Sequence, residues 1–320
     1  MYIRQILKDD SNGWVDFLKL FFTIIITFIF TVVFSVPHFI AIKNKFKMDS
    51  GNDMSDMQAI IELGSMDISS QMQILEPNLN LFLMLLGFVG MLLAVVLCNK
   101  YMNGNSFISL TTSRNKIDFN RIFFSFFLWG SFSALMIILG YFLMPENYVV
   151  NFNFQPFLIL FFIVVLLLPI QTSAEEYLFR GYMMQNLGII TGNRWFPLIA
   201  SSLAFGLLHG ANPEIEKFGN VVFIFYIGSG LFAGIMTLMD EGMELALGWH
   251  AANNMITALL VTADWTALQT HSVLKDISNP ESMPLSDVLI PVLIFFPIML
   301  YIFSKKYNWS NWWEKLFGKI

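Results

Sequence analysis

Polar side chains that could do chemistry occur in three apolar stretches of this sequence, where burying them costs free energy. They are Glu175, Glu176 and Arg180 in the first stretch, His209 in the second, and His250 and Asn254 in the third; the apolar Phe205 lies one helical turn before His209 and is a supporting residue of the second stretch. Ionisable residues inside membrane-length apolar segments are rare and usually mark a functional site. The three stretches therefore define a candidate active site.

The two glutamates of the first stretch predict different roles. Glu176 and Arg180 are four residues apart, so they share one helix face and can form an ion pair. Such a pair would offset much of the cost of burying Arg180. Glu175 points away from that partner, and a poorly solvated carboxylate is suited to general acid–base catalysis. We therefore predict that Glu175 is the catalytic carboxylate and that Glu176 supports the structure.

A turn between the first two stretches predicts that Glu175 and His209 meet. The run Thr191-Gly192-Asn193-Arg194 is a turn signal, and Glu175 and His209 each lie 17 residues from Gly192. In an antiparallel helical hairpin the two side chains would lie at similar depth. A carboxylate and an imidazole placed in this way could hold and deprotonate a water molecule.

The third stretch adds hydrogen-bond donors. His250 and Asn254 share one helix face, and their N–H groups are suitable donors to a developing oxyanion. The combined set predicts a hydrolase that needs no serine or cysteine nucleophile. His38 and His271 have no motif around them and are predicted to be ordinary residues.

A metal site is the alternative use of the same residues. Glu175, His209 and His250 are chemically possible zinc ligands. However, the sequence has no HExxH motif, and the two histidines are 41 residues apart on separate helices. We therefore favour a mechanism without a cofactor, with zinc as the alternative.

The ordered motifs EExxxR, FxxxH and HxxxN resemble those of the CAAX-protease and bacteriocin-processing (CPBP) family, which includes the type II CAAX prenyl endopeptidases. The resemblance covers roughly residues 155–262. It implies eight membrane helices around a conical polar cavity. It also implies that Glu175 activates water with help from His209, that His250 and Asn254 stabilise the oxyanion, and that Glu176 supports the site with Arg180. The family has been classed as metalloproteases.

Eight apolar segments must position these residues. A helix needs about 20 apolar residues to cross the hydrocarbon layer, and only helices suit this pattern. The segments are Leu18–Ile42, Leu81–Cys98, Ile122–Leu143, Phe157–Ile170 (continuing to Ile190), Trp195–His209, Val221–Met239, Leu245–Thr262 and Val288–Phe303. The sequence thus predicts an all-α polytopic membrane protein with about eight transmembrane helices.

The composition agrees with a membrane protein. Hydrophobic residues make up 56% of the 320 residues and charged residues 13%, against about 25% in soluble domains. No basic patch suggests a nucleic-acid partner, and the single Cys98 excludes an intramolecular disulfide. No secretory signal peptide is expected, because the first apolar segment is long and no cleavage site follows it.

Four regions are predicted along the chain. They are an N-terminal segment (1–17), N-terminal transmembrane helices (18–154) with an extramembrane segment (43–80), a CPBP-like catalytic core (155–262), and a loop, last helix and interfacial tail (263–320). Segment 43–80 could form an amphipathic cap, but a plain connector is favoured. In the tail, Trp309, Trp312 and Trp313 predict a helix at the headgroup level.

Basic residues predict the orientation of the chain. Lys100, Arg114, Lys116 and Arg121 follow the second segment, and Lys305, Lys306, Lys315 and Lys319 follow the last. Basic loops face the cytoplasm, so both termini are predicted to be cytoplasmic in a multi-pass protein of the cell (plasma) membrane. Lys43, Lys45 and Lys47 oppose this orientation because they follow the first segment.

The favoured function is an intramembrane endopeptidase that acts on a membrane-associated protein or peptide, with membrane lipid as its other partner. A non-catalytic membrane scaffold or bacteriocin-immunity protein is the main alternative. A bis-histidine haem protein using His209 and His250 would leave both glutamates without a role. The substrate stays open at this point.

Overall fold

The computed structural model describes residues 1–320 except 8–11, 52–53 and 281–283. Each apolar segment predicted from the sequence contains a helix, although the segment predicted to end at Thr262 leaves the helix at Leu260 and enters a strand. The helices that these segments form are α1 (Gly13–Ser50), α4 (Pro77–Tyr101), α6 (Phe119–Leu143), α9 (Trp195–Leu208), α11 (Phe223–Asp240) and α12 (Glu244–Leu260). Two further helices are each made of consecutive pieces. The first consists of α7 (Phe154–Glu176), η3 (Tyr177–Met183) and α8 (Met184–Thr191), and the second of α13 (Ser286–Ile290), η7 (Pro291–Phe295) and α14 (Phe296–Tyr307). The predicted all-α membrane architecture is therefore confirmed.

The predicted number of eight crossings is not confirmed. By length and composition, six helices of the described part of the chain could cross a membrane, and α7, η3 and α8 form one of them, residues 154–191. The apolar helix over residues 195–211 is shorter. Helix α12 has only 17 residues and contains buried Glu244 and His250.

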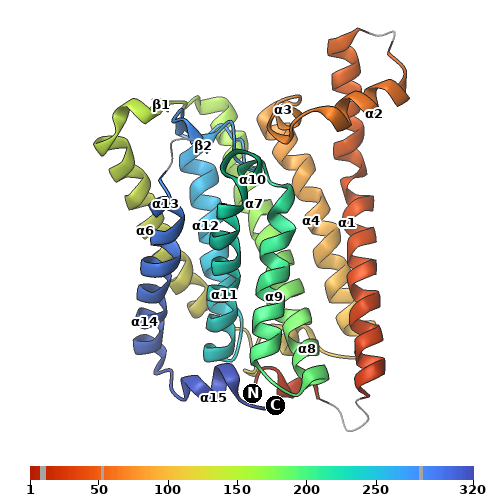
Figure 1. Cartoon of the computed structure of the whole chain (residues 1–320), viewed down its shortest axis with the longest axis vertical. Coiled ribbons are helices and arrows are strands. Elements are labelled where there is room, and N and C mark those ends of the chain that lie inside the picture. The colour runs from red at the N-terminus through yellow and green to blue at the C-terminus, as the bar shows by residue number, and fades with distance from the viewer. Residues whose placement is uncertain (8–11, 52–53, 281–283) are drawn as a thin grey trace.

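The helices run side by side, and both termini lie at one end of the bundle (Figure 1). Helix α12 packs against α6 and α7, α1 packs against α4, and α9 packs against α11. Small residues allow the close contacts that membrane helices use. A Cβ atom at Gly248 would lie 2.0 Å from the carbonyl oxygen of Ile122, so α6 and α12 can approach only if residue 248 is glycine.

Shorter elements close both ends of the bundle. They are η1 (Arg4–Ile6), α2 (Asp56–Ser65), α3 (Ile68–Met72), α5 (Phe107–Thr111), η2 (Pro145–Asn147), η4 (His209–Ala211), α10 (Pro213–Phe218), η5 (Gly219–Val222) and α15 (Trp312–Phe317). A small sheet in the order β1-β3-β2 joins β1 (Tyr148–Val150), β2 (Val261–Ala263) and β3 (Leu274–Asp276) at the end opposite the termini (Figure 1). Strand β3 is antiparallel to β1 and parallel to β2.

The segment between α1 and α4 is folded, which corrects the expectation of a plain connector. Ser55 and Gln58 form a capping box at the start of α2, and Asp67 caps α3. Helix α1 extends to Ser50, so the lysines after the first apolar segment belong to it. Hydrogen bonds from Lys43 and Lys47 lower the pKa of the exposed Asp56 to about 2.

A buried ionic network joins the helices at the end that carries the termini. Asp240 accepts hydrogen bonds from Arg114 (3.0 Å), Arg121 (2.5 Å) and the Trp309 indole (3.0 Å). Trp309 is thus a buried anchor that precedes α15, whereas Trp313 in α15 is exposed. Arg114 and Arg121, predicted only as orienting charges, also stabilise the fold.

Candidate active site

The three motifs meet at one cavity of about 490 Å³. Glu175 reaches it from the end of α7, Phe205 from the end of α9, and His209 from the start of η4. His250 and Asn254 reach it from α12. The structure therefore brings together the candidate catalytic residues named from the sequence. Glu176 and Arg180 are fully buried behind them.

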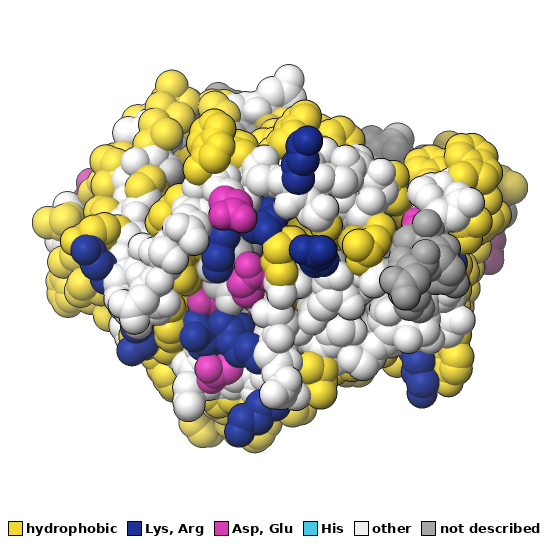
Figure 2. Space-filling model, turned by 90° about the horizontal axis from the view of Figure 1, so that it is seen from below, with side chains coloured by type: hydrophobic (Ala, Val, Ile, Leu, Met, Phe, Trp, Pro, Cys, Tyr) yellow, Lys and Arg dark blue, Asp and Glu magenta, His cyan; other side chains and the backbone are white. Residues whose placement is uncertain are grey.

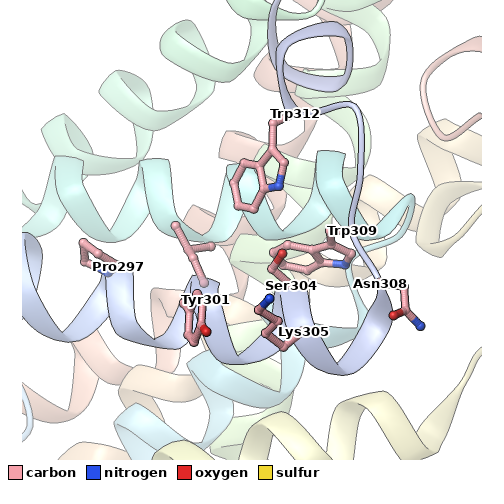
Figure 3. A pocket seen from close by; sticks show the side chains of 8 residues that line it. Pro297, Tyr301, Ser304, Lys305, Asn308, Trp309 and Trp312 are labelled. Atoms are coloured by element: carbon pink, nitrogen blue, oxygen red, sulfur yellow. The ribbon is translucent and has the colours of Figure 1, made fainter.

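A second, larger groove of about 690 Å³ lies between α14 and the C-terminal tail (Figure 3). Its lining includes Tyr301, Lys305, Trp309 and Trp312 but no carboxylate or histidine. The groove lacks the carboxylate and imidazole groups of the three motifs, so the cavity that these motifs line is the candidate active site.

The chain changes its helical form where the two glutamates lie. Helix α7 ends at Glu176, and the π-helix η3 follows from Tyr177 to Met183. A π-helical turn is a frequent feature of functional sites because its extra residue changes the direction of the side chains. Here Glu175 faces the cavity, while Glu176 lies in the protein interior.

Glu176 links two of the motifs through one oxygen. Its Oε1 atom accepts a hydrogen bond from Arg180 Nη1 at 3.0 Å and one from His250 Nδ1 at 2.7 Å. The sequence predicts only the first of these contacts, because the second joins α7 to α12. Glu176 thus orients the imidazole of His250 in the way that a carboxylate orients a catalytic histidine.

Arg180 has further partners in this interior. Its Nη2 atom donates to the carbonyl oxygen of Gly230 at 3.2 Å, and its guanidinium carbon lies 4.2 Å from the centre of the Phe205 ring. Phe205 also packs against both histidines, with ring centres 4.7 Å from His209 and 5.9 Å from His250. The aromatic residue of the second motif therefore contacts Arg180 and both imidazole rings.

We expect Arg180→Ala to destabilise the protein. Removing one partner of a buried ion pair leaves an unpaired charge, which costs about 3–5 kcal/mol. The melting temperature in detergent should fall clearly. The exposed Lys116 is the control, since Lys116→Ala removes a cation without unpairing a buried group. An unchanged melting temperature for Arg180→Ala would show that Glu176 finds another partner.

Glu175 is held by a residue that the sequence interpretation missed. Gln171 donates to Glu175 Oε1 at 2.6 Å and accepts a hydrogen bond from Asn254 Nδ2 at 2.9 Å. Gln171 therefore connects the candidate base to the candidate oxyanion donor. Its position one helical turn before Glu175 was the available signal, because residues four apart share a helix face.

The second oxygen of Glu175 differs from the first, which Gln171 holds. Oε2 is buried, has no hydrogen-bond partner among the described residues, and lies 3.6 Å from His250 Nε2. Buried carboxylate oxygens normally have a partner, so an unpaired one facing a cavity requires an explanation. Binding a water molecule or a substrate group would provide that partner.

His209 lies at the end of α9, after the predicted turn. Gly192 ends α8 with a left-handed φ of 66°, and α9 runs back from Trp195. The Nδ1 atom of His209 hydrogen-bonds the carbonyl oxygen of Phe205 at 2.8 Å, and a carbonyl can only accept. In the neutral ring the proton is therefore on Nδ1, and Nε2 can accept a hydrogen bond from water.

The neighbours of His209 and Asn254 complete the walls of the site. Tyr226 stacks on the His209 ring with centres 4.2 Å apart, and its hydroxyl accepts a hydrogen bond from Asn212. On α12, Asn253 donates to Asn254 Oδ1 at 3.1 Å. The side-chain oxygen of Asn254 is therefore paired with Asn253, and one of its two N–H groups is paired with Gln171. The other N–H can donate to a ligand.

The contact between Glu176 and His250 refines the predicted oxyanion donor. A carboxylate only accepts, so His250 Nδ1 carries the proton in this contact. The opposite nitrogen, Nε2, can then donate to an oxyanion only when the ring is an imidazolium. Glu176 holds Nδ1 and so fixes the orientation of the ring and of Nε2.

The donor set does not fit a zinc ion. Among the described residues, no three His, Cys, Asp or Glu side chains come together in an arrangement that could hold a metal. A catalytic zinc usually has three protein ligands.

The other two histidines, His38 and His271, do not line the cavity. His38 contacts Asn80, and His271 contacts Glu76.

The fold and the site together define a polytopic helical membrane protein with a carboxylate–imidazole cavity. Residues 154–256 match the model of the family described as type II CAAX prenyl endopeptidase Rce1-like. This match includes all three motifs and confirms the predicted resemblance to the CAAX-protease family.

The chain is also similar to the uncharacterized protein YyaK of Bacillus subtilis (strain 168). The two are 30% identical over 188 residues, which is 58% of this chain. The matched region spans 63% of the length of YyaK, less than two thirds of that protein. No solved structure gives a significant match to this chain.

Proposed function

We propose that the chain is an intramembrane endopeptidase that hydrolyses peptide bonds of a membrane-associated protein or peptide, with Glu175 as the base. One observation carries the proposal. The unpartnered Oε2 of Glu175 faces His250 in a cavity that His209 and Asn254 also line. The family match over these motifs supports the same reaction class.

Each residue has a role in this reaction. Glu175 takes a proton from a water molecule that also donates to His209 Nε2, and the water oxygen attacks the peptide carbonyl carbon. The carbonyl oxygen becomes an oxyanion that accepts hydrogen bonds from the His250 imidazolium and from Asn254. The C–N bond then breaks, and the leaving amine takes the proton from Glu175. The products are one carboxylic acid and one amine, with water consumed.

No metal enters this scheme. The absence of a three-ligand cluster among the described residues supports a metal-free reaction, as does the contact of Glu175 Oε1 with Gln171. Glu175 would have to act as a ligand in a zinc site and could not act as the base at the same time.

A peptide library tests the proposal. The chain would be purified in detergent and incubated with the library, with Glu175→Ala as the inactive comparison. Cleavage by the wild type that Glu175→Ala lacks is the expected result. A folded wild type that cleaves no peptide would instead favour a non-catalytic membrane scaffold or a bacteriocin-immunity protein.

Gln171 should act as a positioning residue in this reaction. Hydrogen bonds to charged groups contribute about 1.5–3 kcal/mol, so we expect Gln171→Ala to lower kcat roughly 10- to 100-fold. The value of KM should change little if Gln171 does not touch the substrate. Thr257→Ala changes another residue of the cavity wall and is the control. An unchanged kcat would show that Glu175 and Asn254 keep their positions without Gln171.

We also propose that the chain lies in the cell membrane with both termini in the cytoplasm. Large apolar side chains are exposed along the membrane-length helices, where lipid would cover them. The basic residues gather at the end with the termini, in keeping with the rule that cytoplasmic loops are rich in Lys and Arg.

A further inference from the structure

The groove between α14 and the C-terminal tail has no part in the proposed reaction. We call it the tail groove. It encloses about 690 Å³, which is within the usual size of ligand sites in proteins. Its lining comes from α14, from the loop after α14 and from the first residue of α15, and it shares no residue with the cavity of the three motifs. A ligand of the tail groove would therefore be distinct from the substrate.

The tail forms a fixed wall of this groove. Asn308 and Asn311 adopt left-handed φ values of 53° and 55°, so the chain turns sharply between α14 and α15. Trp309 is anchored in this turn, because its indole donates to the buried Asp240 at 3.0 Å. The ring of Trp312 packs edge to face on Trp309, with centres 5.8 Å apart. The wall is thus held in place by the same ionic network that joins the helices.

The lining of the tail groove changes from apolar to polar along α14. Pro297 and Leu300 line it near the start of α14, and Ser304, Lys305 and Asn308 line it at the end of the helix. Figure 3 shows this order from Pro297 to Asn308 along the helix. A rise of about 1.5 Å per residue gives this stripe a length of roughly 16 Å. An occupant with an apolar part and a polar head fits this gradient.

The polar end of the tail groove attracts an anion. Lys305 is the single cation of the lining, which contains no Asp or Glu. Among the described residues Lys305 forms no ion pair, and its ammonium lies 5.5 Å from the centre of the Tyr301 ring. Arg121 and Lys315, in contrast, pair with carboxylates at 2.5 Å and 3.6 Å. The charge of Lys305 is therefore left for a ligand.

Neutral donors surround this lysine. Ser304, Asn308 and Trp312 carry side-chain O–H or N–H groups, and all three line the tail groove. A phosphate group accepts hydrogen bonds from charged and neutral donors together. Tryptophan and tyrosine rings favour the headgroup level of a membrane. Figure 2 shows the end of the bundle with the termini, where Lys and Arg side chains spread across the face.

We infer that the tail groove binds one anionic phospholipid, with its phosphate at Lys305 and an acyl chain along Pro297 and Leu300. The groove lies on a helix of membrane length, residues 286–307, so lipid is present beside it. Basic pockets at the ends of membrane helices bind anionic lipid headgroups. A free phosphate ion would gain nothing from the apolar half of the groove. The inference does not depend on peptidase activity, so it and the proposed function can fail separately.

Native mass spectrometry of the whole chain in detergent tests the lipid. Phosphatidylglycerol, phosphatidylcholine with the same acyl chains, and inorganic phosphate would each be titrated against the wild type. We expect one phosphatidylglycerol to be retained more strongly than phosphatidylcholine, and inorganic phosphate not to displace it. Equal retention of the two lipids would overturn the anionic site. Displacement by inorganic phosphate would overturn the choice of a lipid as the occupant.

Matched charge variants locate the bound lipid. Loss of one lysine near the headgroups should weaken binding about five-fold, so we expect Lys305→Gln to raise the Kd for phosphatidylglycerol by that factor. Lys116→Gln is the control, because Lys116 is also an exposed lysine and does not line the tail groove. Trp312→Ala removes part of the wall and should weaken binding without a change of charge. Wild-type affinity in Lys305→Gln, or an equal loss in Lys116→Gln, would overturn the tail groove as the site.

Discussion

Glu175→Gln should leave a folded protein that has lost nearly all peptide hydrolysis. The amide keeps an oxygen that can accept the hydrogen bond from Gln171, so the local structure is retained. However, it cannot take a proton from water. General-base catalysis contributes roughly 10²–10⁴-fold, and the loss in kcat should fall in that range.

The measurement compares kcat and melting temperature for wild type and Glu175→Gln in the same detergent. Glu62→Gln is the matched control, because Glu62 is exposed on α2 and does not line the cavity. Activity within a few-fold of the wild type, with the melting temperature unchanged, would show that another group activates the water.

The sequence predicts the helices well because membrane helices leave a strong local signal. The long apolar segments required helices, and the turn at Gly192 followed from its residue types. The number of crossings was harder to predict. Helix α12 is buried by packing against α6 and α7, so its apolar residues face protein and do not need membrane length.

Elements held by distant partners were missed. Strands β1, β2 and β3 have three residues each, so they are too short for an alternating pattern to mark them, and β1 pairs with β3 across more than one hundred positions of the chain. For segment 43–80 the sequence allows an amphipathic cap or a plain connector, and we favoured the connector. Its caps at Ser55 and Asp67 were local signals that could have predicted the helices.

The same limit applies to the site. The pairing of Glu176 with Arg180 depends only on spacing within one helix, and the sequence predicts it. The contact of Glu176 with His250 joins two helices far apart in the sequence, and its existence depends on how α7 packs against α12. Gln171 makes one contact of each kind. Its hydrogen bond to Glu175 lies within one helix and follows from the spacing, whereas its hydrogen bond from Asn254 joins two helices and depends on their packing.

Asn254→Ala should lower turnover strongly with little change in substrate binding. In the proposed reaction one amide N–H of Asn254 donates to Gln171 and the other to the oxyanion, which exists only during the reaction. Loss of one oxyanion donor costs roughly 2.7–4 kcal/mol of transition-state stabilisation, or about 10²–10³ in kcat. Thr257→Ala, one turn further along α12 in the same cavity, should keep both kcat and KM near the wild-type values.

This variant also separates the metal-free mechanism from the zinc alternative when it is combined with chelation. Asn is a poor zinc ligand, whereas Glu175, His209 and His250 would form the metal site. We expect a purified, chelator-treated wild type to keep its activity, because Glu175 serves as the base and has no metal to lose. Stoichiometric zinc in the active protein, with activity lost on its removal and recovered on its return, would contradict the metal-free mechanism. Normal turnover of Asn254→Ala would contradict its role as an oxyanion donor, whatever the metal content.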